Sequence, residues 1–236
     1  MKRCIFMSAI LLLSLTAMAQ EKNDENSSNV IVKDARYCMS YEEYVNDQWK
    51  TVEQLRRVTR TESQMKWSGG TLYRFNKLDK VFDKMLKKEV FAIDFNDTLY
   101  VNFYGLKHKG ALLGTGYDKC YRMGKKIVIT DRYVSKKKNM AIGALAGASG
   151  VFAGAIGGLA VGLANYGLQA KWEKEVCYII DNDTKKITLI DQEMMSTLLA
   201  DHPDLLSQYN QVESKKKKRS AITVMPLLIK AGLIKL

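Results

Sequence analysis

The chain has 236 residues, a formal net charge of +12 at pH 7 and a hydrophobic content of 47%. This length suffices for one well-sized hydrophobic core, and the apolar content with only two prolines excludes general disorder. The large positive charge favours a polyanionic partner, either nucleic acid or an anionic membrane surface. Which partner is expected depends on where the protein resides.

The beginning of the chain has the three parts of a cleavable secretory signal. Lys2 and Arg3 form its basic start, residues 9–15 its largely apolar run, and the triplet AMA before Gln20 its cleavage site. The alternative is a retained anchor helix, but the apolar run is shorter than the roughly 20 residues of a spanning helix. We therefore predict a signal peptide over residues 1–19 and export to the periplasm or cell envelope, where the anionic partner is lipid and not nucleic acid.

Composition divides the mature chain into four parts. Residues 20–36 are rich in Ser, Asn and charged side chains, so we predict a polar linker. Residues 37–135 and 171–236 both contain strand-like and helix-like patterns, and we expect them to form one α+β domain. Residues 139–170, between these two parts, contain eight glycines and no charged residue, which indicates a glycine-zipper helical segment.

Two helices are predicted in the first part of the domain. Ser40 and Glu43 have the spacing of a capping box, in which each side chain binds a free backbone N–H, so a short helix should begin at Tyr41. Further along, Asn76 is the expected N-cap of a helix with one apolar face. The residues of that face are Leu78, Val81, Phe82 and Met85.

Three β-hairpins are predicted from paired runs of aromatic and β-branched residues. Their turns lie at Asn96-Asp97, Gly124-Lys125 and Asn182-Asp183, where Asn, Asp and Gly tolerate the left-handed backbone of tight turns. The last part of the chain is helical by pattern, with Pro203 in a first helical turn and Pro226 expected to kink or end any continuation. The predicted fold is α+β: an antiparallel sheet built from β-hairpins, interrupted by a glycine-rich helical hairpin and followed by a C-terminal helix.

Four stretches together resemble a family of exported, uncharacterised proteins of Gram-negative bacteria. They are SYEEYVND, AIDFNDTLYVNFYGL, the glycine-rich segment and LLADHPDLLSQY, and the resemblance covers most of the mature chain. It implies export, but it brings no known activity and no site residues. The glycine-rich segment by itself resembles the glycine-zipper segments of some envelope proteins.

The sequence contains no pattern typical of a catalytic, cofactor or metal site. His108 and His202 are the only histidines and belong to no HExxH motif; we expect them in a surface loop and at a helix start. Removal of the signal leaves Cys38, Cys120 and Cys177, which are either three separate buried thiols or a Cys120–Cys177 disulfide plus one thiol. We therefore predict that the protein is not an enzyme and holds no cofactor or metal.

Glycines in the glycine-rich segment recur with helical spacing. Its row of Gly150, Gly154, Gly158 and Gly162 recurs at every fourth position, so on a helix it forms a smooth groove that admits a second backbone. A flexible linker would contain more polar residues and lack this spacing. A soluble packing helix is the other alternative, although each glycine costs about 1 kcal/mol relative to alanine. We favour membrane insertion or tight self-association through the groove.

The neighbours of the segment constrain its form. Strands are predicted on both sides of it, and if they share one sheet the chain must return to the side it left, so we predict two helical limbs. Two basic runs, which are either solvated surface or contacts with an anionic surface, accompany the segment. They are Lys136, Lys137 and Lys138 before it, and Lys215, Lys216, Lys217, Lys218 and Arg219 near the C-terminus.

These features predict an exported cell-envelope protein with a structural or interaction role. Its expected partners are membrane lipid or other copies of the chain, including a homo-oligomer. The alternative is a soluble periplasmic binding module, in which the glycine-rich helix is an internal packing element.

Overall fold

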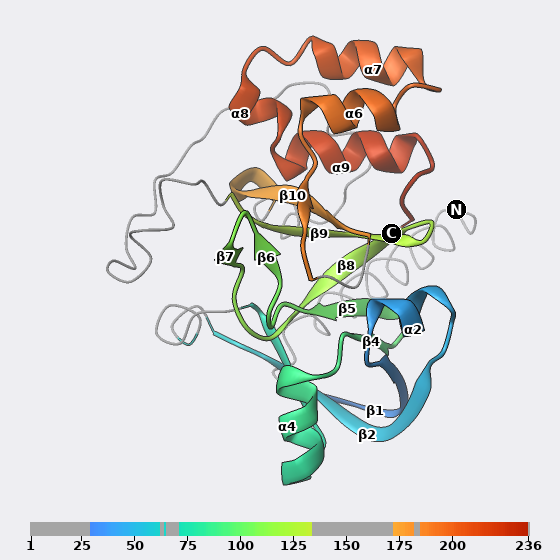
Figure 1. The fold of residues 1–236 in the computed structure, drawn as a ribbon, viewed down its shortest axis with the longest axis vertical. Coiled ribbons are helices and arrows are strands. Elements are labelled where there is room, and N and C mark those ends of the chain that lie inside the picture. The colour runs from blue at the N-terminus through green and yellow to red at the C-terminus, as the bar shows by residue number, and fades with distance from the viewer. Residues whose placement is uncertain (1–28, 62–63, 65–70, 134–171, 182–184, 236) are drawn as a thin grey trace, which may run out of the picture.

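The structure is a computed structural model that describes residues 29–61, 64, 71–133, 172–181 and 185–235 (Figure 1). Over these residues the protein is α+β, with an antiparallel sheet of nine strands and a layer of helices at one end. The predicted antiparallel sheet with a C-terminal helix is confirmed. The predicted signal peptide and the predicted glycine-rich helical hairpin lie outside the described residues.

The described strands form one large sheet and one small ribbon. The large sheet has the order β11-β10-β9-β8-β3-β2-β1-β4-β5, and β6 pairs with β7 in the ribbon. The strands are β1 (Asn29–Cys38), β2 (Lys50–Thr59), β3 (Tyr73–Asn76), β4 (Ala92–Phe95), β5 (Thr98–Asn102), β6 (Lys107–His108), β7 (Ala111–Leu112), β8 (Tyr117–Met123), β9 (Lys126–Arg132), β10 (Glu175–Ile180) and β11 (Thr188–Leu189). The strands of all three predicted hairpins pair, and Asn96 and Asp97 have the expected left-handed backbone, with φ of 50° and 56°.

A second pairing of β8 closes six of the strands into a ring. Tyr117 at the start of β8 pairs with Tyr73 of β3, and the same part of β8 also pairs with β5, so the ring runs β8-β3-β2-β1-β4-β5. Every strand of the ring contributes to the core cluster that the ring encloses. At its centre Phe75 contacts three aromatic rings edge-on, with centroids 5.0, 5.2 and 5.3 Å away.

The helices begin largely where local chemistry predicts. They are α2 (Tyr41–Val45), α4 (Lys80–Lys88), α6 (Gln192–Leu198), α7 (Pro203–Asn210), α8 (Lys215–Lys218) and α9 (Ala221–Lys230). The Ser40 half of the predicted capping box of α2 is confirmed, because the Ser40 hydroxyl accepts a 3.0 Å hydrogen bond from the Glu43 N–H. The Glu43 carboxylate in turn accepts a 2.6 Å bond from the N–H of Met39. Pro203 is the first residue of α7, as predicted.

The predicted start of α4 is wrong. Its N-cap is Asp79 and not Asn76, because the Asp79 carboxylate accepts 2.9 Å hydrogen bonds from two N–H groups of the first helical turn. Leu78 and Val81, which the pattern places on the apolar face, are exposed to solvent. Leu86 is the fully buried residue of this helix.

Of the two effects predicted for Pro226, the end of the helix is wrong, because α9 continues through this proline. The kink stays a prediction. A proline inside a helix removes one backbone hydrogen bond and costs about 3 kcal/mol. Burial offsets this cost, since four neighbouring side chains of α9 have no exposed surface. They are Val224, Met225, Leu227 and Leu228.

Strand β1 begins inside the predicted polar linker. It pairs with β2 from Asn29 onward, whereas the linker is predicted over residues 20–36. The β-branched residues Val30, Ile31 and Val32 favour a strand despite the polar composition around them. The folded part of the chain therefore begins before residue 37.

A buried asparagine fastens α4 to the ring. The Asn102 side chain, 4% exposed, donates hydrogen bonds of 3.1 and 3.0 Å to the backbone carbonyls of Leu86 and Val90. The Tyr117 hydroxyl donates a 2.6 Å bond to the same Leu86 carbonyl. Carbonyls in the last turn of a helix have no partner within the helix, so Asn102 and Tyr117 supply the missing donors.

We predict that Asn102→Ala lowers the free energy of unfolding by about 2 kcal/mol, because it leaves two buried carbonyls without this donor. Tyr117→Phe is the matched control, since it removes one hydroxyl donor and should cost about 1 kcal/mol. Urea unfolding followed by circular dichroism measures both values. An Asn102→Ala protein as stable as the unchanged protein would contradict the anchoring role.

Candidate functional site: a basic pocket beside the glycine-rich segment

Residues 134–171 connect two strands that lie side by side. Six antiparallel residue pairs join β9 to β10, from Ile127 with Ile180 to Arg132 with Glu175. A connection between antiparallel neighbours must return to the end of the sheet at which it left. The strands before and after the segment therefore share one sheet, which is the condition from which two limbs are predicted. The row of Gly150, Gly154, Gly158 and Gly162 lies outside the described residues.

Packed aromatic side chains hold the chain at both ends of this connection. At the exit, the guanidinium carbon of Arg219 lies 3.7 Å from the centroid of the Tyr133 ring, a close cation–π contact. At the return, Trp172 is fully buried in the cluster formed with the C-terminal helices, and its ring lies 6.3 Å from that of Tyr121. The exit is thus tied directly to the C-terminal basic run.

Arg219 and Tyr133 line a surface pocket of about 360 Å³. Four cationic side chains face this pocket against two carboxylates, an excess of two positive charges. The cations are Lys109, Lys215, Lys218 and Arg219, and the carboxylates are Asp191 and Glu193. Lysine and arginine side chains around one concave surface are the groups that bind phosphate and other oxyanions.

The C-terminal basic run divides between the pocket and the open surface. Lys215, Lys218 and Arg219 line the pocket, while Lys216 and Lys217 are exposed on the same helical turn. Lys218 and Arg219 are half-buried, and the Lys218 ammonium lies 5.6 Å from the centroid of the Tyr209 ring. The end of the run is therefore packed against aromatic rings. The predicted contact residues Lys136, Lys137 and Lys138 lie outside the described residues.

No sequence pattern indicates that Lys109 and Tyr133 belong to the pocket. Lys109 follows β6, which lies against the chain just before β11 through two backbone hydrogen bonds. The Lys107 N–H donates to the Lys185 carbonyl at 2.9 Å, and the Ile187 N–H donates to the Lys107 carbonyl at 3.0 Å. This long-range contact brings Lys109 to the C-terminal run.

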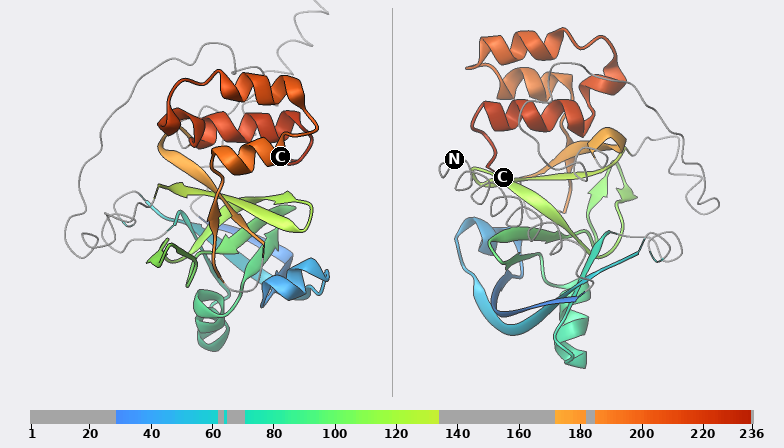
Figure 2. Two further views of the ribbon diagram at one scale, coloured as in Figure 1. Left: turned by 45° about the horizontal axis from the view of Figure 1, so that its top comes forward. Right: turned by 180° about the vertical axis from the view of Figure 1, so that it is seen from behind.

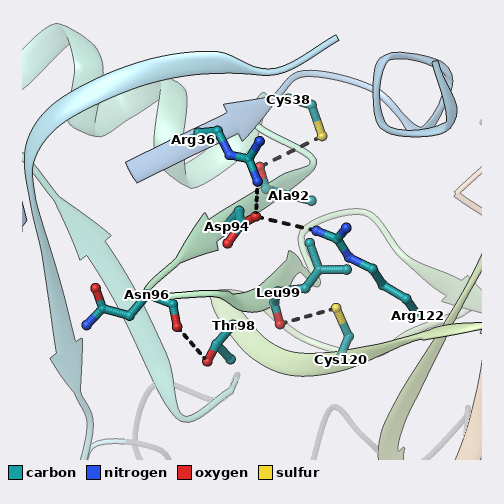
Figure 3. Close-up of polar contacts among 9 residues, drawn as sticks. All are labelled: Arg36, Cys38, Ala92, Asp94, Asn96, Thr98, Leu99, Cys120 and Arg122. Carbon is teal, nitrogen blue, oxygen red and sulfur yellow. Dashed lines mark hydrogen bonds and ion pairs between the residues drawn. The ribbon is translucent and has the colours of Figure 1, made fainter. Parts of the chain in front are cut away.

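In a second basic cluster the arginines already pair with a carboxylate of the protein. Arg36 and Arg122 converge on the carboxylate of Asp94, at 2.6 and 3.4 Å (Figure 3). Both guanidinium groups also lie over the Trp49 ring, at 5.5 and 5.9 Å from its centroid. Because the buried Asp94 carboxylate already lies between the two arginines, we assign this cluster to the joining of β1, β4 and β8.

The predicted surface location of His108 is wrong. The side chain is 4% exposed, its Nδ1 lies 3.1 Å from the Ile187 carbonyl oxygen, and its ring lies 5.0 Å from that of Tyr178. The pairing of the β6 strand with the chain before β11 covers this histidine. His202 is the N-cap residue of α7, which agrees with the predicted helix start.

The described cysteines are three separate, buried thiols. Cys120 belongs to the core cluster on one face of the sheet and Cys177 to the cluster on the other face, so a Cys120–Cys177 disulfide is wrong. Burial raises the pKa of Cys38 to about 12, and it raises the pKa values of Cys120 and Cys177 as well. Cys38 and Cys120 point toward the carbonyl oxygens of Ala92 and Leu99, respectively (Figure 3).

Comparison with known protein families gives one match, to a family of unknown function (DUF6563) over residues 36–235. The chain belongs to this family. No curated protein and no solved structure matches it. DUF6563 is a family of unknown function, as the sequence resemblance led us to expect, and membership assigns no activity. Within the residues that the structure describes, every helix is too short or too polar to cross a membrane.

We predict that the thiols of the folded protein react with iodoacetamide at pH 8 about a hundredfold more slowly than those of the protein in urea, because the thiolate is the reactive form. The raised pKa of Cys38 also sets a pH dependence. Its contribution to stability is fully present below about pH 9 and is lost as the pH rises toward 12, since only the unfolded thiol ionises there.

Mass spectrometry after timed alkylation measures the reaction, and urea midpoints between pH 8 and 10.5 measure the stability. Cys38→Ala is the control for the second measurement, because it removes one ionising thiol and should flatten the pH profile. Rapid alkylation of the folded protein would contradict the buried position of the three thiols.

Proposed function

We propose that this DUF6563 protein is a cell-envelope structural or interaction protein. Its glycine-rich segment attaches the α+β body to a membrane or to other copies of the chain, and the basic pocket contacts anionic head groups beside that attachment. The observation that supports this most is the contact between Arg219 and Tyr133, the last described residue before the segment. It brings the C-terminal basic run to the residue at which the chain leaves the described sheet toward that segment.

The continuity of the sheet supports a segment that acts outside the body. β9 and β10 pair with each other up to Arg132 and Glu175, so the sheet is complete at this position without any strand from residues 134–171. The exit and the return are neighbours, which suits a projection with two limbs. A row of glycines at every fourth position suits close helix packing within such a projection or between copies.

Electrostatic screening favours a lipid contact made by the charges at the pocket over attraction by the total charge of the chain. Each basic residue close to an anionic bilayer contributes about 1 kcal/mol, and the effect falls off within a Debye length of about 8 Å at physiological salt. Charges near the point of attachment therefore matter more than the total charge of the chain. Lys215, Lys218 and Arg219 are near that point because Arg219 packs on Tyr133.

We predict that deletion of residues 139–170 leaves the fold intact and abolishes membrane association or self-association. The strands on both sides remain paired, and the residues left between them close a short connection. Circular dichroism measures the fold, and detergent-free fractionation with size-exclusion chromatography measures the association of the shortened and full-length proteins.

Two outcomes would contradict this proposal. If the segment is an internal packing element of a soluble binding module, the shortened protein should misfold. Complete release of the full-length protein by high salt without detergent would exclude insertion, and a monomer in that fraction would also exclude self-association.

We predict that Lys215→Gln/Lys218→Gln weakens binding to phosphatidylglycerol vesicles about thirtyfold, which corresponds to the loss of about 2 kcal/mol for two charges near lipid. Lys125→Gln/Lys126→Gln is the matched control, because it removes two charges at the opposite end of β9. Vesicle flotation measures both affinities. Equal losses from the two pairs would show that binding follows net charge and not the pocket.

A further inference from the structure

Helix α4 projects from the body at the end opposite to α6, α7 and α9, as all views show (Figures 1 and 2). Two apolar side chains lie at the start of this helix, Leu78 at 75% and Val81 at 81% exposure. Among the described residues these are the two most exposed large hydrophobic side chains. A single exposed apolar residue is ordinary on a protein surface, whereas two neighbours on a projecting tip indicate an interaction site.

Leu78 has a backbone conformation that a leucine rarely adopts. Its φ is 62°, in the left-handed region, where a bulky side chain is unfavourable and asparagine or glycine fits better. Two carboxylates hold this turn: Asp83 accepts a 2.7 Å hydrogen bond from the Lys77 N–H, and Asp79 caps the helix. A strained residue that is exposed and firmly held points to a function for its side chain.

Lysines flank the two apolar residues in sequence, alongside the carboxylates Asp79 and Asp83 that hold the turn. Lys77, Lys80 and Lys84 are all exposed, and Lys87 and Lys88 follow on the same helix. The ammonium of Lys77 lies 5.7 Å from the centroid of the Phe82 ring, which places it beside the apolar tip. Exposed apolar side chains with exposed lysines on the same turn and helix match the interface of an anionic bilayer, where apolar groups enter the acyl boundary and lysines remain near the phosphates.

We infer that this α4 tip, consisting of Leu78, Val81, Lys77, Lys80 and Lys84, inserts shallowly into the interface of an anionic lipid bilayer. A protein partner fits less well, because a specific protein interface buries about 800 Å² on each side and needs complementary shape. Two side chains on a convex projection supply only a small part of that area. The inference rests on the proposed function for a lipid partner, and it adds a second lipid contact to it.

The position of the tip has a consequence for the protein as a whole. Helix α4 and the turn α8, which carries the pocket residues Lys215 and Lys218, lie toward opposite ends of the long axis of the body (Figure 1). One flat bilayer cannot contact both ends at once. A protein with both contacts therefore joins two bilayers, and it should cluster anionic vesicles.

The test uses the mature full-length chain with an environment-sensitive dye on Leu78→Cys. The cysteines at 38, 120 and 177 are buried, so the dye labels the new thiol selectively. We expect a blue shift and quenching by brominated lipid with phosphatidylglycerol vesicles, and neither with phosphatidylcholine vesicles. Leu112→Cys is the matched control, an apolar residue at 59% exposure on β7, and should show no change.

The outcomes separate this inference from the proposed function. Flotation with anionic vesicles but no dye response at position 78 would overturn the tip contact and leave the proposed function standing. Absence of any flotation would overturn the tip contact and the lipid contact of the proposed function, and would leave self-association as the role of the glycine-rich segment. A dye response that grows with protein concentration without vesicles would also overturn the inference, because the tip would then contact another copy of the chain.

A second measurement separates binding from folding. Leu78→Asn/Val81→Gln removes the apolar tip, yet asparagine suits the left-handed turn, so the urea midpoint should not fall. In a Lys215→Gln/Lys218→Gln background, we expect this variant to weaken vesicle binding at least tenfold. In the unchanged background it should still bind vesicles but no longer cluster them, as turbidity reports. Clustering equal to that of a Leu112→Asn control would overturn the inference.

Discussion

The pairing of β9 with β10 is the constraint on which the rest of the structure depends. Side chains alternate across both strands, so that Ile129 and Tyr178 face the ring while Val128 and Cys177 face the C-terminal helices. The two strands therefore contribute residues to both core clusters, and each cluster would lose part of its contacts without them. The same pairing places Arg132 and Glu175, which precede and follow residues 134–171, opposite each other.

The location of the basic pocket follows from the position of the β9–β10 pair. Because α6, α7 and α9 pack on the outer face of β9 and β10, the short turn α8 between α7 and α9 lies near the end of β9. Arg219 can then stack on Tyr133, and the pocket forms where the chain leaves the sheet. A run of basic residues that is far from β9 in sequence thus lies beside Tyr133, where the chain leaves this strand.

Features that depend on adjacent residues could be predicted from the sequence, and features that depend on distant contacts could not. The turn at Asn96-Asp97 and the Ser40 cap need only their own backbone geometry. The closure of the ring through Tyr117, by contrast, depends on strands far apart in the chain. In the same way the C-terminal basic run is visible in the sequence as a candidate for contact with an anionic surface, whereas the pocket itself was not predicted, because Lys109 reaches it through the long-range pairing of β6.

Net charge alone explains neither proposed lipid contact, because a lysine acts on a bilayer only within about one Debye length. The two sites differ from the rest of the basic surface because each combines cations with aromatic or apolar side chains, which suit the lipid–water interface. At the pocket, Lys218 and Arg219 lie on tyrosine rings; at the tip, lysines flank Leu78 and Val81. Leu78 and Val81 are exposed and belong to none of the core clusters, so the tip residues can change in sequence without loss of contacts in the core. At the pocket, by contrast, Lys218 lies on the buried Tyr209, so a change there also alters a contact with the core.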